Sequence, residues 1–170
     1  MNRKIYIKNE LVSLAEYIKE IDDIDLYECW GDRATEDGYN HKMTSTFDEF
    51  KGRKWRQRFT ATVIRNSDDT PVGSIFVSPE DCEPDLAFMI YAPYRRMGYG
   101  SAAFELGVKY CFEVLNLDYI YAGCYEGNIA SEKIITKCGF IHTPEIDEKE
   151  KHYLSGKPIV QRGYMIRKPK

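Results

Sequence analysis

The sequence has few of the residues from which metal sites and disulfide frameworks are built. Three of its 170 residues are histidines, and none of them is spaced as H-x-x-x-H, so a dedicated zinc site has little support. The five cysteines are an odd number and include no C-x-x-C pair, which favours reduced thiols in the cytoplasm. A chain of this length can bury about 70% of its unfolded surface, so we expect it to fold without a metal or a disulfide.

Long apolar runs and a large excess of one charge are also missing. No 18 consecutive residues are apolar, which argues against a membrane span. Lys8, Asn9 and Glu10 interrupt the amino-terminal segment before an export signal could form. The 24 lysines and arginines nearly balance 27 aspartates and glutamates, for a formal net charge of -3, so neither nucleic acid nor a membrane is an expected partner. No repeat or linker divides the chain, and residues 1–170 are predicted to form one domain.

What the sequence does contain is a mixed order of predicted strands and helices. Apolar patterns predict strands at residues 10–17, 56–65, 72–77, 86–91, 119–125 and 159–167. Helices are predicted after Asp22, after a capping box that begins at Thr46, and over residues 98–115 and 128–138. Residues 31–40 are rich in turn formers and predict a loop. This order favours the α/β (α+β) class, with a mixed central sheet flanked by helices.

The stretch YAPYRRMGYGSAA, residues 91–103, concentrates the chemistry of the chain. A buried strand leads here into the first turn of a long helix, whose free N–H groups and partial positive charge favour an anion. Gly98 and Gly100 would remove the Cβ atoms that keep a pyrophosphate away, and Arg95 and Arg96 would add positive charge. Two glycines can also merely ease a turn, so this pattern alone leaves both interpretations open.

A dinucleotide-binding fingerprint is a competing interpretation of the same glycines. Residues 98–103 satisfy G-x-G-x-x-A, and Asp118 follows about 20 residues later. In that fold, however, the first glycine directly follows the first strand. Here residues 93–97 intervene, Asp118 precedes its strand, and too little chain follows for a doubly wound sheet. We do not favour this interpretation.

Two motifs at a suitable separation point to a known family. Residues 95–100, RRMGYG, match [RQ]-x-x-G-x-[GA]. A second pattern, N-x-x-S-x-[RK] followed by G-F, is matched by Asn128, Ser131, Lys133, Gly139 and Phe140. The chain resembles the Gcn5-related N-acetyltransferase (GNAT) superfamily, in the branch similar to ribosomal-protein N-terminal acetyltransferases. The resemblance implies one GNAT-like domain with a sheet of about six or seven strands that splays between the fourth and fifth, about four flanking helices, and an N-acetyltransferase activity.

The resemblance also implies which residues bind acetyl-CoA, the expected cosubstrate. The N–H groups around residues 96–101 would hold the pyrophosphate, and the pantetheine arm would pair with the free edge of the strand at residues 86–91. The implied cofactor-binding residues are Ile90, Tyr91, Arg95, Arg96, Met97, Gly98, Tyr99, Gly100, Ser101, Asn128 and Lys133. Asn128 is equally well explained as a helix N-cap, and Lys133 as a solvated helix lysine.

Acetyl transfer needs a base for the amine and a proton donor for the departing thiolate. Asp85 is the first candidate for the base, because it matches the acidic residue that often opens this strand in the family; Glu83 and Glu126 are alternatives. Ser131, one helical turn beyond Asn128, is the candidate donor. Many members of the family instead place a tyrosine where this chain has Ile135, which removes the usual acid. A thiol of pKa about 8.5 leaves tolerably, so the donor is the more dispensable group.

Charge patterning bears on the acceptor. Residues 10–49 contain 12 acidic and 3 basic residues, among them Asp22, Asp23, Asp25, Glu36 and Asp37 near the loops expected to line the acceptor entrance. This predicts a primary amine on a cationic acceptor: a basic protein amino terminus, a polyamine or an aminoglycoside-like amine. The basic run at residues 51–58 could contact phosphates, but a solvated strand edge is favoured. The alternative to an enzyme is a CoA-binding sensor or interaction module without turnover, and either a monomer or a homodimer is compatible with the sequence.

Overall fold

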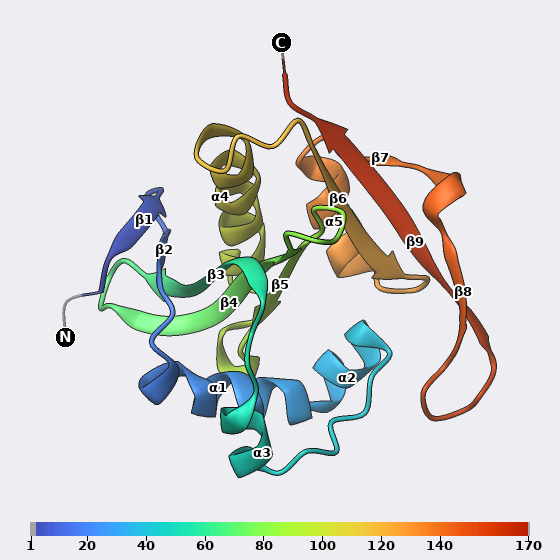
Figure 1. Ribbon diagram of the computed structural model, residues 1–170, viewed down its shortest axis with the longest axis horizontal. Coiled ribbons are helices and arrows are strands. Elements are labelled where there is room, and N and C mark those ends of the chain that lie inside the picture. Colours follow the sequence, from blue (N-terminus) through green and yellow to red (C-terminus); the bar gives the residue numbers. More distant parts are fainter. Residues whose placement is uncertain (1–2, 170) are drawn as a thin grey trace.

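Two antiparallel sheets form the centre of the protein (Figure 1). The computed structural model describes residues 3–169. Within them, a five-stranded sheet has the order β1-β2-β3-β4-β5, and a smaller sheet has β9 between β6 and β7, with β8 also paired to β9. The strands are β1 (Ile5–Lys8), β2 (Val12–Glu16), β3 (Gln57–Arg65), β4 (Thr70–Pro79), β5 (Leu86–Ile90), β6 (Tyr119–Tyr125), β7 (Ile141–His142), β8 (Glu148–Lys151) and β9 (Pro158–Arg167).

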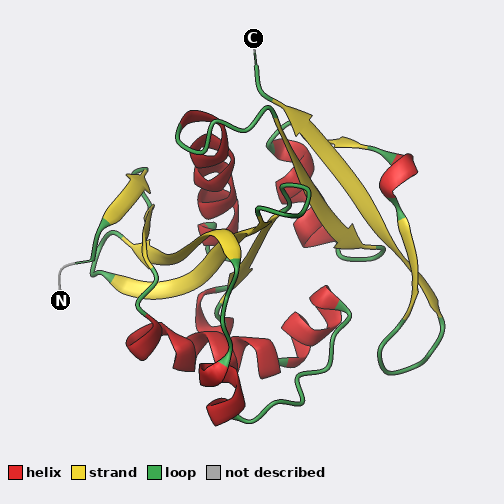
Figure 2. Ribbon diagram, in the orientation of Figure 1, coloured by secondary structure: helices red, strands yellow, loops and turns green. Residues whose placement is uncertain are grey.

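Helices lie on both sides of β5, and Figure 2 shows them as two groups. They are α1 (Lys19–Gly31), α2 (Arg33–Tyr39), α3 (Phe47–Gly52), α4 (Tyr99–Glu113) and α5 (Ile129–Lys137), with 3-10 turns η1 (Ala92–Tyr94) and η2 (Pro144–Ile146). On one side, α4 and α5 join Leu86 and Ile90 in the main hydrophobic core. On the other, α1 and α3 enclose Met89 and Tyr91 in a second cluster. Burial on both sides explains the nearly continuous apolar run of β5.

Strands β5 and β6 meet only where they begin. Asp85 and Tyr121 form an isolated parallel bridge, and the Tyr121 N–H donates to Pro84 O at 2.8 Å. Beyond this bridge β5 continues beside β4, and β6 continues beside β9. The two strands therefore separate, and this is the splay predicted between the fourth and fifth strands of the sequence.

Two glycines let α4 approach the larger sheet closely. A Cβ at Gly107 would lie 2.4 Å from Ile75 Cδ1 of β4, and a Cβ at Gly100 would lie 3.1 Å from Phe88 Cε2 of β5. Side chains at these positions would push the helix away from the sheet. Glycine therefore places the first turn of α4 beside the last residues of β5.

The fold class is confirmed, but the described chain has more elements than the sequence predicts. Residues 31–40 contain α2 rather than a loop only: Asp32 caps it by accepting the N–H groups of Ala34 and Thr35, and Asn40 ends it with a left-handed φ of 49°. The short strands β1, β7 and β8 are also unpredicted, because runs of two to four residues carry little periodicity. Residues 3–169 hold nine strands and five α-helices, against about six or seven strands and about four helices predicted.

Candidate active site

A cavity of about 470 Å³ lies in the splay between β5 and β6. Its wall is formed by these two strands, the first turn of α4, and parts of α2 and α5. The residues predicted from the sequence that line it are Asp85, Ile90, Arg95, Arg96, Gly98, Gly100, Ser101, Asn128 and Ser131. The fold thus brings the phosphate-binding motif and the two catalytic candidates to one cavity.

The first turn of α4 offers backbone donors to this cavity. Arg96 and Gly98 both have left-handed backbone conformations, with φ of 63° and 86°, so the chain turns sharply before the helix. Gly98 is the N-cap and has no side chain to bind the free N–H groups of the first turn. These donors, at the positive end of a 15-residue helix, fit a pyrophosphate group.

Gly100 makes room for apolar side chains, and its role beside a pyrophosphate stays a prediction. A Cβ at this position would lie 3.1 Å from Phe88 Cε2, 3.4 Å from Ile134 Cδ1 and 3.5 Å from Ile90 Cγ1. All four residues line the cavity. A side chain at position 100 would therefore crowd the part of the cavity between β5 and α5.

The main-chain groups on the free edge of β5 belong to Leu86, Phe88 and Ile90. The Tyr91 N–H donates to Val72 O of β4 at 2.9 Å, so Tyr91 directs its main chain into the sheet. In an antiparallel pair, successive residues alternate in the side to which their N–H and C=O groups point. The pairing of the pantetheine arm that the sequence assigned to Ile90 and Tyr91 is therefore available at Phe88 and Ile90 instead.

Three other residues predicted to bind the cofactor lie outside the cavity wall. The side chain of Met97 is exposed, and that of Tyr99 is buried in the main core. Both residues flank Gly98 within the motif. Lys133 is exposed on α5, in agreement with a solvated helix lysine.

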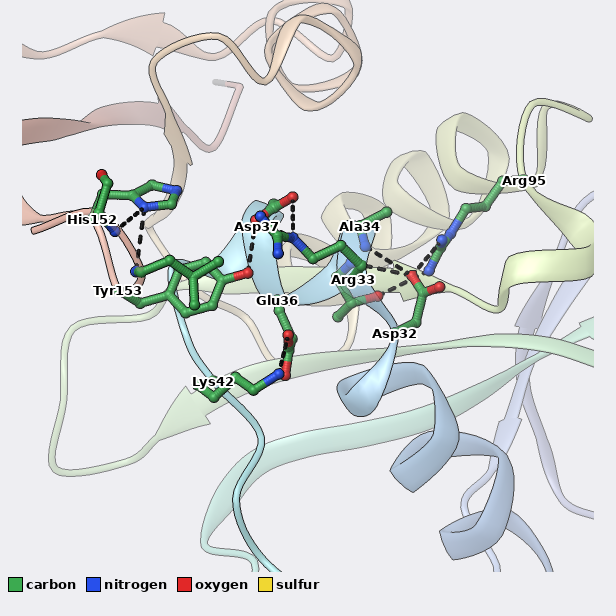
Figure 3. Close-up of polar contacts among 12 residues, drawn as sticks. Asp32, Arg33, Ala34, Glu36, Asp37, Lys42, Arg95, His152 and Tyr153 are labelled. Atoms are coloured by element: carbon green, nitrogen blue, oxygen red, sulfur yellow. Dashed lines mark hydrogen bonds and ion pairs between the residues drawn. The ribbon is translucent and has the colours of Figure 1, made fainter. Parts of the chain in front are cut away.

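The two arginines of the motif have different surroundings. Arg95 Nε donates to Ile90 O at 2.9 Å, and its terminal nitrogens bind Asp32 at 2.6 Å and Thr35 at 2.9 Å; Figure 3 shows the contact with Asp32 at the start of α2. Partial burial of Asp32 works against its ionisation, but the hydrogen bond and charge of Arg95 lower the pKa of this carboxyl. The Arg95 side chain therefore holds α2 as well as lining the cavity, and its phosphate role stays a prediction. Arg96 is exposed beside the first turn of α4.

Asp85 lies where two cavities meet. It lines the first cavity and a second one of about 360 Å³, whose wall also includes Glu148 and Gln161. Burial, aided by the charge of Glu148, raises the pKa of Asp85 to about 6. The carboxyl is therefore ionised at neutral pH and still basic enough to take up a proton.

The two alternative bases are engaged elsewhere. Glu83 accepts a hydrogen bond from the Tyr119 hydroxyl at 2.7 Å, and Glu126 binds Arg162 at 3.3 Å. Of the three predicted carboxylates, Asp85 is the one that lines the first cavity.

Helix α5 presents one polar turn and then an apolar wall. Asn128 Oδ1 accepts the Ser131 N–H at 3.2 Å, which confirms the N-cap interpretation of Asn128. Ser131 lines the cavity, but one turn later Ile135, which is 2% exposed, occupies the position at which many members of the family have a tyrosine.

Comparison with known proteins decides the family. The model of the acetyltransferase (GNAT) domain matches residues 13–141. The chain belongs to the GNAT acetyltransferase family. No curated protein matches the sequence closely enough to add a nearer relative.

Solved structures share the GNAT fold along almost the whole chain. An acetyltransferase of the GNAT family from Bacillus anthracis is 20% identical, with a TM-score of 0.74 over 95% of this chain and 97% of that one. Spermidine N-acetyltransferase from Vibrio cholerae, in complex with CoA and spermine, is 15% identical, with a TM-score of 0.80 over 94% and 96%. A putative ribosomal-protein-serine acetyltransferase from Vibrio cholerae is 18% identical, with a TM-score of 0.67 over 95% and 97%. These likenesses show the fold, and the family makes the protein an acyl-CoA N-acetyltransferase.

In this GNAT protein, α2 is tied to the hairpin formed by β8 and β9. Asn40 Nδ2 donates to Glu150 Oε2 at 2.9 Å, and Asn40 Oδ1 accepts the Tyr153 N–H at 2.8 Å. The Tyr125 hydroxyl of β6 donates to Glu150 at 3.0 Å. The Tyr153 hydroxyl donates to Asp37 at 2.7 Å, which Figure 3 shows. These contacts join α2 and β6, which both line the cavity, to the hairpin of β8 and β9.

Most of the carboxylates predicted at the acceptor entrance bind other groups of the protein, which corrects the expectation of a free acidic entrance. Four of the five carboxylates bind neighbouring groups: Asp22 binds Arg3 and Thr62, Asp23 binds Tyr17 and Lys19, Glu36 binds Lys42, and Asp37 binds Arg33 and Tyr153. The structure instead places Glu83, Asp85 and Glu148 around the second cavity.

Several cavity residues are not apparent from the sequence. The Tyr39 hydroxyl donates to Phe88 O at 2.6 Å. The Gln161 side chain covers Gly123, at which a Cβ would lie 3.0 Å from Gln161 Nε2, and both residues line both cavities. Tyr39 belongs to the unpredicted α2, and Gln161 lies in a strand whose place beside β6 has no local signal.

Two further observations concern other ligands and surroundings. Within residues 3–169, no three His, Cys, Asp or Glu side chains gather in a way that could hold a metal ion. No helix in this part of the chain is long and apolar enough to cross a membrane.

Proposed function

We propose that this GNAT protein transfers the acetyl group of acetyl-CoA directly to a primary amine, with Asp85 as the general base. The observation that carries the proposal is the position of Asp85: it is a largely buried carboxyl, with a pKa raised to about 6, in the same cavity as the first turn of α4. An acyl acceptor and a phosphate-bearing donor can both reach this cavity.

Acetyl-CoA would be held mainly by main-chain groups. The free N–H groups of residues 99–101 and the exposed Arg96 suit the pyrophosphate. The N–H groups of Phe88 and Ile90 suit the carbonyl groups of the pantetheine arm, because the C=O groups of the same residues already accept hydrogen bonds from Tyr39 and Arg95. A thioester at the end of this arm supplies an activated carbonyl.

Asp85 would make the acceptor nucleophilic. An amine at neutral pH is an ammonium ion, and the Asp85 carboxylate can accept one of its protons directly or through water. The neutral nitrogen then forms a C–N bond with the thioester carbon, the C–S bond breaks, and the nitrogen loses its second proton. The products are an amide and CoA.

An acceptor with more than one positive charge suits the second cavity best. Glu83, Asp85 and Glu148 contribute carboxylates to its wall, and the guanidinium of Arg162, also in this wall, binds Glu126 and Glu132. The spermidine N-acetyltransferase with a TM-score of 0.80 is in complex with CoA and spermine. A polyamine is therefore the first candidate acceptor, before a basic protein amino terminus and an aminoglycoside-like amine. The free thiols of all five cysteines favour the cytoplasm as the place of action.

Binding without turnover is the second candidate function, because Ile135 replaces the usual tyrosine. Incubation with isotopically labelled acetyl-CoA and a pool of polyamines, aminoglycosides and amino-terminal peptides separates the two. Mass spectrometry should find label in an amide of a multiply charged amine, and Asp85→Asn should lose it. Acetyl-CoA binding by calorimetry without any labelled amine would favour the sensor.

A further inference from the structure

The apolar side chains of α5 leave the proposed reaction without a proton donor for the thiolate at the usual position. Ile135 is 2% exposed and Ile134 lies beside it in the cavity wall, so this part of α5 offers no proton to a departing thiolate. Hydroxyl groups do reach the cavity from other positions. They belong to Thr35, Tyr39, Tyr94, Ser101, Tyr125 and Ser131.

Three of these hydroxyls are bound to neighbouring side chains or lie away from the proposed reaction. Thr35 accepts a hydrogen bond from Arg95 at 2.9 Å, and the Tyr125 hydroxyl donates to a carboxylate, that of Glu150, at 3.0 Å. Ser101 lies in the phosphate-binding turn of α4. Tyr39 differs from them because its hydroxyl donates to a main-chain oxygen in the middle of the free edge of β5, Phe88 O, at 2.6 Å.

The position of Tyr39 lies between the phosphate site and the base. Phe88 is two residues from Ile90, beside which α4 begins, and three residues from Asp85. At about 3.3 Å per residue, the hydroxyl is roughly 10 Å from the start of the strand at Asp85. An extended arm that runs along this edge from α4 toward Asp85 must pass it.

We propose that Tyr39 is the proton donor to the CoA thiolate, a role that rests on the proposed acetyl transfer. As the C–S bond breaks, the phenolic proton moves from Tyr39 to sulfur. The phenolate regains a proton from the nitrogen of the new amide, which carries one in excess. Of the two protons that the ammonium loses, one ends on sulfur through Tyr39 and the other reaches solvent through Asp85.

The surroundings of Tyr39 keep its hydroxyl protonated and oriented. Its ring packs against Trp30, with ring centroids 4.9 Å apart, and its hydrogen bond to Phe88 O fixes the direction of the hydroxyl. Burial raises the pKa of Tyr39, and the nearby Asp85 and Cys29 act in the same direction, against the bond to Phe88. A neutral phenol can exchange its hydrogen bond to a carbonyl for a stronger one to a thiolate.

The test begins with two matched variants, each of which removes one phenolic hydroxyl. In Tyr39→Phe we expect kcat to fall about 10- to 100-fold, toward the low end for acid catalysis because a thiolate leaves readily. The acetyl-CoA KM should stay within about threefold. Tyr27→Phe is the control: its hydroxyl also donates to a main-chain oxygen, Ser45 O at 3.0 Å, but it does not line the cavity. An unchanged kcat in Tyr39→Phe, or a larger loss in Ser131→Ala, would overturn the proposal.

A binding measurement distinguishes proton donation from a merely structural role. At pH 9, where much of the thiol is ionised, calorimetry should show that the wild type binds CoA about tenfold more tightly than desulfo-CoA. Tyr39→Phe should bind the two ligands nearly equally. If Tyr39 only supports β5, both affinities will fall together and the ratio will persist, which contradicts the proposal. This ratio can be measured even in a protein that acetylates no amine, so its outcome is separate from that of the proposed function.

Discussion

The two halves of the active-site cavity are built in different ways. The cofactor half, formed by β5 and the first turn of α4, is shaped by backbone: Gly98 has a φ of 86°, and a Cβ at Gly100 would lie 3.1 Å from Phe88. The other half, formed by α2, β6 and the hairpin of β8 and β9, borders the second cavity proposed for the amine. We call it the acceptor half, and polar side chains hold it together. Asn40 and Glu150 are central to these contacts.

This difference teaches that affinity for the two substrates should be separable by mutation. In the proposed function, backbone conformation at the first turn of α4 sets the direction of the donors for acetyl-CoA, whereas the side-chain contacts of α2 hold the opposite wall. The two halves meet at Asp85, which directly precedes β5 and lines both cavities. Variants of Asp85 should therefore affect turnover rather than either affinity.

The largest effect is expected for Asp85→Asn. Loss of the base should lower kcat/KM for the amine about 10²- to 10⁴-fold. In the wild type, activity should rise with pH through about 6 as Asp85 loses its proton, and the variant should lack this inflection. Glu148→Gln is the control: removing the charge that helps to raise the Asp85 pKa should move the inflection to lower pH. An inflection near 6 that persists in Asp85→Asn would assign it to another group.

The same substitution should stabilise the fold. The folded state raises the Asp85 pKa from its usual value near 3.9 to about 6, so it favours the protonated form. Below about pH 4, Asp85 is protonated in both the folded and the unfolded state and does not lower the free energy of unfolding. As pH rises through about 6, the folded state must hold the ionised carboxylate, and the free energy of unfolding falls. Denaturant unfolding at pH 8 should therefore show Asp85→Asn to be more stable than the wild type by on the order of 2–3 kcal/mol, with little difference at pH 4. Equal stabilities at pH 8 would contradict the burial of an ionised carboxylate.

Gly98→Ala should break the cofactor half. An alanine forced into the left-handed region costs about 1–2 kcal/mol, and relief of this strain would turn the N–H groups of α4 away from the cavity. We expect the acetyl-CoA Kd to rise at least about tenfold by calorimetry, with the acceptor KM unchanged. Gly139→Ala is the matched control, because Gly139 has a φ of 88° at the far end of α5. Equal losses of acetyl-CoA affinity in both variants would show that Gly98 matters only for the stability of the fold.

Asn40→Ala should break the acceptor half. It removes three side-chain hydrogen bonds to the hairpin, to Glu150, to Lys151 O and from the Tyr153 N–H. A loss of about 1.4 kcal/mol in positioning this wall corresponds to a tenfold rise in the acceptor KM. The acetyl-CoA KM should not change. Asn116→Ala, at another left-handed asparagine with a φ of 53°, controls for backbone strain, and an equal effect there would remove Asn40 from the acceptor wall.

The smallest effects are expected at the two arginines of the motif, and they should differ in kind. Arg96→Gln should weaken acetyl-CoA binding about threefold, because an exposed charge adds modestly to phosphate binding. Arg95→Gln should leave that affinity unchanged and lower the free energy of unfolding by about 1–3 kcal/mol, since Asp32 and Ile90 O lose their partner. The reverse pattern would assign the phosphate role to Arg95.

The sequence predicts the cofactor half of the cavity better than the acceptor half. The glycine motif at residues 95–100 and the N-cap Asn128 could be predicted because backbone conformation and helix capping restrict the residue types at those positions. The base candidate Asp85 followed from the family resemblance. The splay between β5 and β6 followed from the resemblance that this motif carries. Local patterns therefore contain most of the cofactor half.

The rest depends on contacts between distant segments. Arg95 was predicted to bind phosphate because its charge is visible in the sequence, but its partners Asp32 and Thr35 lie about 60 residues earlier in the chain. Asn40 and Glu150 are 110 residues apart. No local period or motif pairs such side chains, and α2, only seven residues long, has too few turns for a clear apolar face.

The central claim is direct acetyl transfer to an amine, and the release of CoA thiol in the presence and absence of the amine tests it most directly. Thiol release and acetylated product should be measured in the same incubation, with the wild type and Asp85→Asn side by side. The account predicts thiol release that saturates with amine concentration, one amide for each thiol, and little of either in the variant. Thiol release that is independent of the amine, or none at all despite bound acetyl-CoA, would contradict it.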